Sequence, residues 1–320
     1  MTKRSAASGG IVAGTLLFAM TAWGQVAAPS LTPFSFVTEN PAVMQWGSPS
    51  RVGAGAAQAQ AVLDPSAANP SQAKVNDNFS GYGGGIRLVG QRLSAAAEYT
   101  QLDSTTKPNH TAEYIADAKA ALGLRLADSL ALGAGQTNHT SQTSQPGGWF
   151  REQDEIPQYG LSLRLGQWFF LGGVAGQDFV SFKDSVTPQN DFHTSHDVYK
   201  YGAGIRTSGT LVAHLEYYVV DFQKYAKHNL AQSGKETSST GVAEFNLGGF
   251  LLGYAATHTE QDANQPTTDE ERLDIGYAPF AGWTIVARGQ VEKQKFPQPS
   301  PVNNVTATTY SVLVTYLFKT

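Results

Sequence analysis

The last segment of the chain, residues 306–318, alternates between two kinds of side chain. Every second residue is apolar or aromatic: Tyr310, Val312, Val314, Tyr316 and Phe318. The residues between them are smaller or more polar, so a β-strand here has one apolar face and one mixed face. A strand at the end of a chain leaves an unpaired edge unless another strand covers it. We therefore predict that this strand pairs with the first one and closes an all-β, antiparallel barrel whose apolar face contacts lipid.

The composition supports a barrel and excludes several other classes. Charged residues make up 15% of the chain, below the ~25% of soluble domains, and 33 of 320 residues are Gly. Aromatic residues reach 11% while mean hydropathy is only −0.25, which excludes a helical membrane protein and fits hydrophobicity spread over alternate residues. The net charge of −4 and the lack of a basic stripe argue against nucleic acid as a partner. The lack of Cys excludes disulfides, a thiolate nucleophile and Cys-based metal sites.

The N-terminus has the three parts of an export signal. Lys3 and Arg4 provide the positive start, residues 11–20 the apolar stretch, and Ala22 and Gly24 the small residues before a cleavage site. The apolar stretch is too short for a transmembrane helix. We predict a signal peptide over residues 1–24, an N-terminal periplasmic or plug-like segment over 25–44, a barrel over 45–320, and a location in the cell outer membrane.

Short turns and long polar loops alternate along the chain. The short turns fall at residues 90–91, 127–128, 166–167, 208–209, 248–249 and 281–282, and the long loops at 103–111, 138–155, 183–197, 224–236, 260–269 and 295–306. Transmembrane barrels place short turns in the periplasm and long loops outside the cell. We count about fourteen strands, of which residues 46–62 form the weakest. Without that strand, and with two others merged, the number would be twelve.

The alternation assigns most strands an outer and an inner face. Leu163, Leu215 and Ile285 are expected to face outward, whereas residues 168–182 and 250–258 show no clear division. The predicted lumen-lining residues are Arg87, Arg92, Glu98, Glu113, Asp117, Lys119, Arg125, Arg164, Arg206, His214, Glu216, Glu244, Asp274, Arg288 and Glu292. These charges either form a constriction that selects solutes or pair with one another and fill a narrow lumen. Both interpretations stay open at this point.

Histidines gather in the predicted loops, where they are the main candidates for other chemistry. The densest run contains Asp191, His193, His196 and Asp197, residue types that bind divalent metals. No second loop supplies a partner at a fixed spacing, so we predict no metal and no cofactor. A hydrolase would need Ser162, His214 and Glu216 to meet. No spacing marks a nucleophile, and we predict that the protein is not an enzyme.

One short motif resembles a known family. The step Asn40-Pro41-Ala42, followed by residues 51–56 (RVGAGA) and a run of hairpins, is similar to the FadL/OmpP1/TodX family of outer-membrane transporters of hydrophobic compounds. The resemblance implies a fourteen-stranded barrel, an N-terminal plug that carries the Asn-Pro-Ala motif, and uptake of apolar small molecules. Two features depart from the family's pattern: only about twenty mature residues precede the first strand, which is short for the family's plug, and the chain is shorter overall. The terminal aromatic Phe318 resembles the last strand of bacterial outer-membrane barrels in general, which usually ends on the aromatic itself, whereas Lys319 and Thr320 follow it here.

These observations lead to three functional hypotheses. The first is an outer-membrane channel or transporter for small molecules, hydrophobic ones included, that pass through the charged lumen or the barrel wall. The second is a structural or adhesion barrel that its own ion pairs plug and that acts through its loops. The third is an outer-membrane hydrolase. The expected partners are outer-membrane lipid, lipopolysaccharide and a small-molecule solute.

Overall fold

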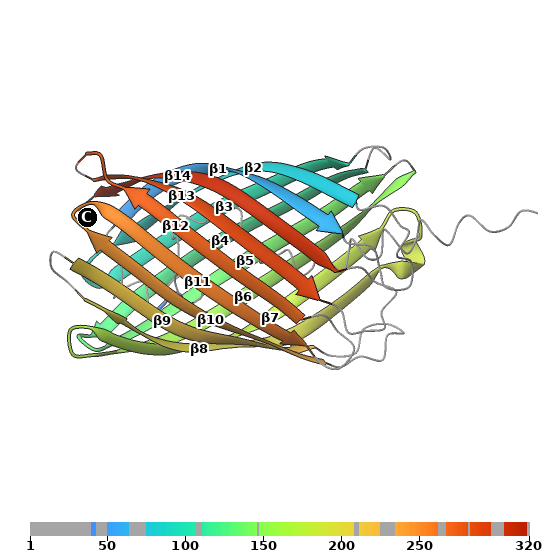
Figure 1. Ribbon diagram of the computed structural model, residues 1–320. Coiled ribbons are helices and arrows are strands. Elements are labelled where there is room, and N and C mark those ends of the chain that lie inside the picture. The colour runs from blue at the N-terminus through green and yellow to red at the C-terminus, as the bar shows by residue number, and fades with distance from the viewer. Residues whose placement is uncertain are drawn as a thin grey trace, which may run out of the picture.

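Fourteen antiparallel strands close into a single barrel in the computed structural model (Figure 1). The structure describes residues 40–42, 50–63, 75–106, 111–145, 147–207, 211–224, 234–261, 267–280, 282–295 and 304–318. The strands are β1 (Ser50–Leu63), β2 (Val75–Val89), β3 (Leu93–Thr106), β4 (Thr111–Ala127), β5 (Leu130–Gln145), β6 (Gly148–Leu165), β7 (Phe169–Asp184), β8 (Phe192–Arg206), β9 (Leu211–Lys224), β10 (Gly234–Leu247), β11 (Phe250–Gln261), β12 (Thr267–Tyr277), β13 (Trp283–Lys295) and β14 (Val305–Phe318), with a short 3₁₀ turn η1 (Pro188–Asn190) between β7 and β8. The prediction of fourteen strands is confirmed, and the twelve-strand alternative is wrong.

The closing contact joins the two ends of the barrel. β14 pairs with β1 along its whole length, from Ser50 opposite Phe318 to Leu63 opposite Val305 (Figure 1). Gly55 permits this close pairing, because a Cβ at that position would lie 2.6 Å from the carbonyl oxygen of Val312. Residues 46–62 gave only a weak strand signal because small residues show little alternation in hydrophobicity. The backbone pairing with β14 nevertheless makes β1 a full strand.

The two faces of the wall differ as the alternation predicted. On β14, Tyr310 and Val312 are 68% and 53% exposed, whereas Leu313 is 2% exposed. Leu215 and Ile285 are likewise exposed, and Leu163 is half-buried. The two undecided segments also divide into faces. Inward positions include Phe170 and Val174 on β7 and Ala255 on β11, and outward positions include Phe250, Leu252 and Tyr254 on β11. Among the described residues, no helix is long and apolar enough to cross a membrane.

The short turns lie together at one end of the barrel, where β14 also ends (Figure 1). Gly248 and Gly249 join β10 to β11 with φ values of 58° and 88°, the left-handed backbone that a two-residue hairpin turn requires. At the opposite end, two predicted loops are mostly strand. β5 and β6 meet through residues 146–147, and β8 begins at Phe192. These strand ends carry polar residues on both faces, so they show no alternation and looked like loops in the sequence.

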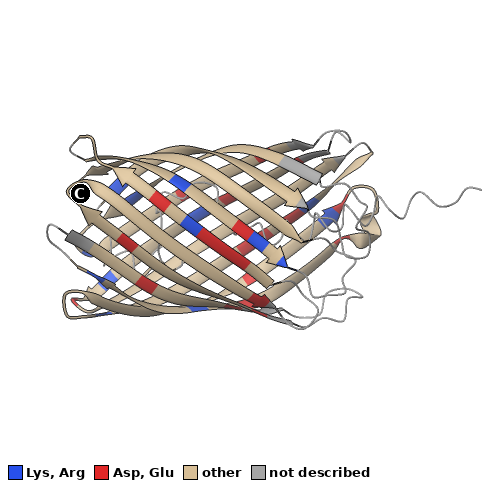
Figure 2. Cartoon of the chain, in the orientation of Figure 1, with Lys and Arg blue, Asp and Glu red and all other residues tan. Residues whose placement is uncertain are grey.

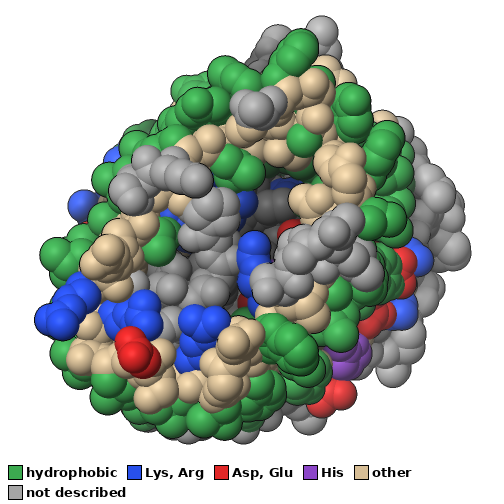
Figure 3. Space-filling model, turned by 90° about the vertical axis from the view of Figure 1, so that its left-hand side faces the viewer, with side chains coloured by type: hydrophobic (Ala, Val, Ile, Leu, Met, Phe, Trp, Pro, Cys, Tyr) green, Lys and Arg blue, Asp and Glu red, His purple; other side chains and the backbone are tan. Residues whose placement is uncertain are grey.

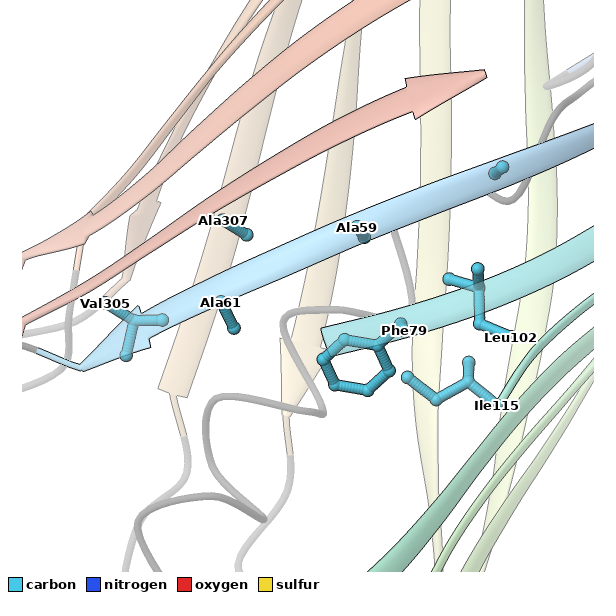
Figure 4. Close-up of a cluster of buried hydrophobic side chains, with 8 residues drawn as sticks. Ala59, Ala61, Phe79, Leu102, Ile115, Val305 and Ala307 are labelled. Carbon is cyan, nitrogen blue, oxygen red and sulfur yellow. The ribbon is translucent and has the colours of Figure 1, made fainter. Parts of the chain in front are cut away.

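Small and apolar side chains cluster on the inner face near the loop end (Figure 4). The cluster, here called the apolar lumen patch, consists of Ala57, Ala59, Ala61, Phe79, Leu102, Ile115, Val305 and Ala307. It covers five neighbouring strands, from β14 through β1 to β4. The lumen is therefore apolar on this side.

We predict that Val312→Arg destabilises the barrel when it is folded in lipid vesicles. Val312 lies at the middle of β14 on the outer face, where an Arg costs about 2–4 kcal/mol in hydrocarbon. Urea titration of the vesicle-inserted protein measures the loss. Glu260→Arg near the loop end is the control and should cost only about 0–1 kcal/mol. Equal losses in the two variants would contradict contact between Val312 and lipid.

Candidate transport lumen

The Asn-Pro-Ala step is fixed to the inner wall of the barrel. Asn40 and Ala42 are completely buried, and Pro41 is buried between them. The side-chain amide of Asn40 donates to the carbonyl oxygens of Leu161, at 3.2 Å, and Gly173, at 3.4 Å. Its own amide oxygen accepts a hydrogen bond of 2.9 Å from the backbone N–H of Ala42. Asn40 thus connects two neighbouring strands, β6 and β7, and folds its own backbone into a turn.

The wall contains a recess for this turn. Gly133 on β5, Gly160 on β6 and Gly172 on β7 all face it, and a Cβ at any of them would collide with residues 40–42. Ser162 on β6 lies beside the recess, and its hydroxyl donates to the carbonyl oxygen of Ala42 at 3.0 Å. Glycine is therefore needed at these positions because a larger residue would collide with the turn. The sequence alone gave the motif but did not reveal the strands that receive it.

The predicted lumen residues on strands share the phase of the buried, inward positions. Arg87, Glu113, His214, Glu216, Asp274, Arg288 and Glu292 are buried, and Glu98, Asp117, Lys119, Arg125, Arg164, Arg206 and Glu244 are partly buried. Arg92 lies in the turn after β2 and is exposed. Figure 2 shows that both signs of charge occur along the wall.

Basic residues gather at the turn end. Figure 3 looks at this end of the barrel, with Lys and Arg side chains around the opening and hydrophobic side chains around the outer edge. Two of the arginines are held by their own turns. Arg125 pairs with Asp128 at 2.8 Å, and Arg164 donates to the carbonyl oxygen of Gln167 at 2.7 Å. These contacts hold positive charge at the mouth.

Charges also interact across the lumen just inside the turn end. Arg51 on β1 is opposite Arg87 on β2, and its charge interacts with those of Glu244 on β10 and Arg206 on β8. Four strands separate β1 from β10 along the wall, so this interaction crosses the interior. The lumen thus has mixed charge at this height. Arg51 was not predicted to line the lumen because its strand gave a weak signal.

The most complete ion pair lies on β12 and β13. Arg288 donates to both carboxylate oxygens of Asp274, with distances of 2.8 and 3.0 Å, and both residues are at least 96% buried. Glu270 and Arg272 continue the same inward row on β12. The prediction missed these two because it assigned them no face, although Asp274, Arg272 and Glu270 follow one another at every second position.

Two histidines predicted in loops lie on strands and face the lumen. His139 on β5 contacts Asp117 on β4 through Nδ1, 2.8 Å from the carboxylate, and His196 on β8 lies 3.5 Å from Asp178 on β7. The prediction that placed these two histidines in loops is wrong. Because β5 and β8 extend into the predicted loops, both histidines lie on strands, at positions that face inward.

The strand β8 also separates the candidate metal ligands. His196 is buried on the inner face, whereas His193 is exposed on the outer face, as the alternation requires, with Asp197 in the same outward phase. Asp191 precedes the strand and accepts a hydrogen bond from the backbone N–H of Asp184. No group of three or more His, Asp or Glu that could hold a metal occurs among the described residues.

The residues considered for a hydrolase do not assemble. His214 and Glu216 on β9 are in contact, with Nε2 2.6 Å from the carboxylate. Ser162, however, is on β6, three strands away, and its hydroxyl is bonded to Ala42. A serine engaged with the Asn-Pro-Ala turn is not aligned with an imidazole for nucleophilic attack.

The hydrogen-bond ladder between β6 and β7 is interrupted at one point. Pairing runs from Phe150–Asp184 to Glu155–Phe179 and resumes at Gln158–Gly176, so residues 156 and 157 lack partners on β7. The cause is Pro157, which has no N–H to donate and which interrupts a sheet wherever it lies inside one. The gap lies near the point where Asn40 connects the same two strands.

Comparison with known proteins identifies the fold. No family model matches the chain, and no curated protein matches it. Solved structures do match the chain. One of them is the monoaromatic hydrocarbon channel CymD, with a TM-score of 0.56 and 12% sequence identity over 88% of this chain and 92% of that chain. The chain has the fold of the hydrocarbon-channel barrels. A FadL homologue of Pseudomonas aeruginosa (TM-score 0.57, 10% identity, 93% and 97% covered) and the toluene transporter TodX of Pseudomonas putida (0.55, 9%, 89% and 94%) agree with it. At these identities the likeness concerns the fold.

We predict that Asn40→Ala releases the Asn-Pro-Ala turn from the wall. The variant loses both donors to β6 and β7, a change of about 1–3 kcal/mol. Hydrogen exchange of residues 40–42 in the vesicle-inserted protein should accelerate, and conductance in planar bilayers should rise. Ser238→Ala is the control, because Ser238 lies inside the barrel on β10 and bonds Thr259 rather than the turn. Unchanged exchange in Asn40→Ala would contradict the anchoring role.

Proposed function

We propose that this chain is an outer-membrane transporter that carries small apolar molecules into the cell. The observation that carries the proposal is the Asn-Pro-Ala turn, buried inside a fourteen-stranded barrel and fixed to its wall by Asn40. CymD is a monoaromatic hydrocarbon channel and TodX a toluene transporter, and both share this fold. The export signal, with cleavage after Gly24, lies outside the described residues and belongs to the proposal.

The inner surface supports an apolar solute. The apolar lumen patch makes the inner face of the barrel apolar at the loop end, and Phe79, Leu102 and Ile115 are buried there. Transfer of an apolar molecule to such a surface is favourable by about 25 cal/mol per Å² of area removed from water. A polar solute would gain nothing there. The patch is therefore the proposed first contact for a solute that arrives from outside.

The charges deeper in the lumen favour closure over a wide aqueous pore. Asp274 and Arg288 are buried and form a bidentate ion pair, and the charges of Arg51, Arg206 and Glu244 interact across the interior. Paired buried charges hold a structure together but leave little room for water-filled passage. We therefore assign the charged lumen residues a role in closing and bracing the lower barrel, and expect low ionic conductance.

The gap in the β6–β7 ladder is the proposed route through the wall. Two positions without backbone hydrogen bonds to β7 make the seam at Pro157 easier to separate than a complete ladder. Asn40 bonds to both strands of the same seam, so movement of the turn would act on it directly. A solute on the apolar lumen patch would thus leave sideways into lipid, without crossing the charged lower lumen.

The test is uptake of labelled toluene by cells that lack their own hydrocarbon channels and express the full chain. Expression should raise the initial rate of uptake while planar bilayers stay almost silent. Absence of any increase would overturn the transport function and favour the structural or adhesion barrel.

Pro157→Ala tests the route separately. Alanine restores the missing N–H and completes the ladder, so uptake should fall several-fold if the seam opens. Pro279→Ala, in the turn between β12 and β13, is the matched control and should leave uptake unchanged. Full uptake by Pro157→Ala would exclude the seam and leave passage through the lumen.

A further inference from the structure

Two cations lie opposite each other on the outer surface of β6 and β7, near the loop end of the barrel. Arg151 on β6 is directly opposite Lys183 on β7, and both lie on outward positions. Like charges directly opposite in a sheet are destabilising. Neither side chain has an ion-pair partner within the described part of the chain. The outward carboxylate of Glu155 is four residues down the same strand, roughly 13 Å away.

Neighbouring side chains hold Arg151 in place. Gln142 on β5 accepts hydrogen bonds from Arg151 Nε, at 2.9 Å, and Nη2, at 2.6 Å. The guanidinium also lies over the ring of Trp149, 5.4 Å from its centroid. The backbone of Trp149 is in turn bonded to Ser185 just beyond β7. An ordered cation without an anion among the described residues is pre-organised for a ligand that those residues do not supply.

The height of the pair on the barrel indicates which anion it meets. From Leu165 to Arg151, a strand that rises ~3.3 Å per residue and tilts ~40° climbs roughly 35 Å along the barrel axis. The apolar band of such a barrel is only ~25 Å tall, so Arg151 lies about 10 Å above it. That is the level of lipid headgroups. In the outer leaflet of an outer membrane, these are the phosphorylated sugars of lipopolysaccharide.

Another cation on the outer surface at the loop end, Lys295, differs from this pair because an acidic side chain balances its charge. Lys295 on β13 is bonded to Asp269 at 3.0 Å, and Asp269 also contacts His258 at 2.7 Å. The charge of Lys295 is thus balanced within the protein. Arg151 and Lys183 have no such balance, although they lie on the same outer surface.

We propose that Arg151 and Lys183 together bind a phosphate group of the lipopolysaccharide headgroup. Arg supplies a planar guanidinium suited to phosphate oxygens, and Lys supplies a second positive charge. The bound phosphate turns a repulsive cross-strand pair into a bridge between β6 and β7. The inference rests on the outer-membrane placement in the proposed function, and it deepens that function by naming a lipid partner for the wall that contains the proposed seam.

The test compares thermal unfolding of the full chain in phosphatidylcholine vesicles with and without lipopolysaccharide. Lipopolysaccharide should raise the Tm of the wild type by about 2 °C or more. Arg151→Gln with Lys183→Gln should lose most of that rise. In vesicles without lipopolysaccharide the same double variant should be at least as stable as the wild type, because the like-charge repulsion is gone. Lys295→Gln, the matched control, should keep the full rise.

Each other outcome decides against the proposal. A double variant that keeps the full rise, or an equal rise with dephosphorylated lipopolysaccharide, would show that these cations do not bind the phosphate. A double variant that is less stable in both kinds of vesicle would show a purely structural role. Failure of the wild type to insert into either vesicle would instead count against the outer-membrane placement, and a normal Tm rise without toluene uptake would count against transport alone.

Discussion

The pairing of β14 with β1 is the interaction on which the rest of the structure depends. Hydrocarbon offers no hydrogen-bond partners, so a sheet in a membrane must satisfy every backbone N–H and C=O within itself. A continuous pairing from Ser50–Phe318 to Leu63–Val305 leaves no open edge. Closure also fixes which side of each strand is inside. The apolar residues at alternate positions therefore face outward, and the charged ones meet in the lumen.

In a closed barrel, an interruption of the pairing between two neighbouring strands is a local weakness in the wall. Within the described strands the only proline is Pro157, and the ladder between β6 and β7 is interrupted beside it. The same two strands receive the amide of Asn40 and present the outward pair Arg151 and Lys183. Three separate features thus act on one seam. In the proposed function, the Asn-Pro-Ala turn would hold this seam from inside and a lipid phosphate from outside.

The interior joins two environments that have different physical roles. Near the loop end, the apolar lumen patch removes hydrocarbon surface from water and suits an apolar solute. Farther down, Asp274 and Arg288 form a bidentate pair, and charges on β1, β8 and β10 interact across the lumen. Such a pair is stable because the guanidinium donates two hydrogen bonds to the carboxylate that balances its charge. An apolar molecule would gain nothing from this lower region, which is the reason for passage through the wall in the proposed function.

Much of the fold could be predicted from residues alone. The alternation from Tyr310 to Phe318 required a strand with two different faces, and the short turn at Gly248 required a hairpin. The Asn-Pro-Ala step pointed to the right fold. The predicted positions of His139 and His196 were wrong because these residues lie where a strand leaves the apolar band and is polar on both faces. Alternation in hydrophobicity disappears there, although the backbone pairing continues.

Local periodicity determined the class of this protein, the number of its strands and the side of the wall on which most residues lie, because a period of two is a property of each strand by itself. Only the tertiary structure decided which distant residues meet. Three arrangements depend on register and closure: the recess of Gly133, Gly160 and Gly172 for Asn40, the electrostatic interaction of Arg51 with charges across the lumen, and the position of Arg151 opposite Lys183. Register is set by the sum of contacts around the whole barrel, so no single segment contains it.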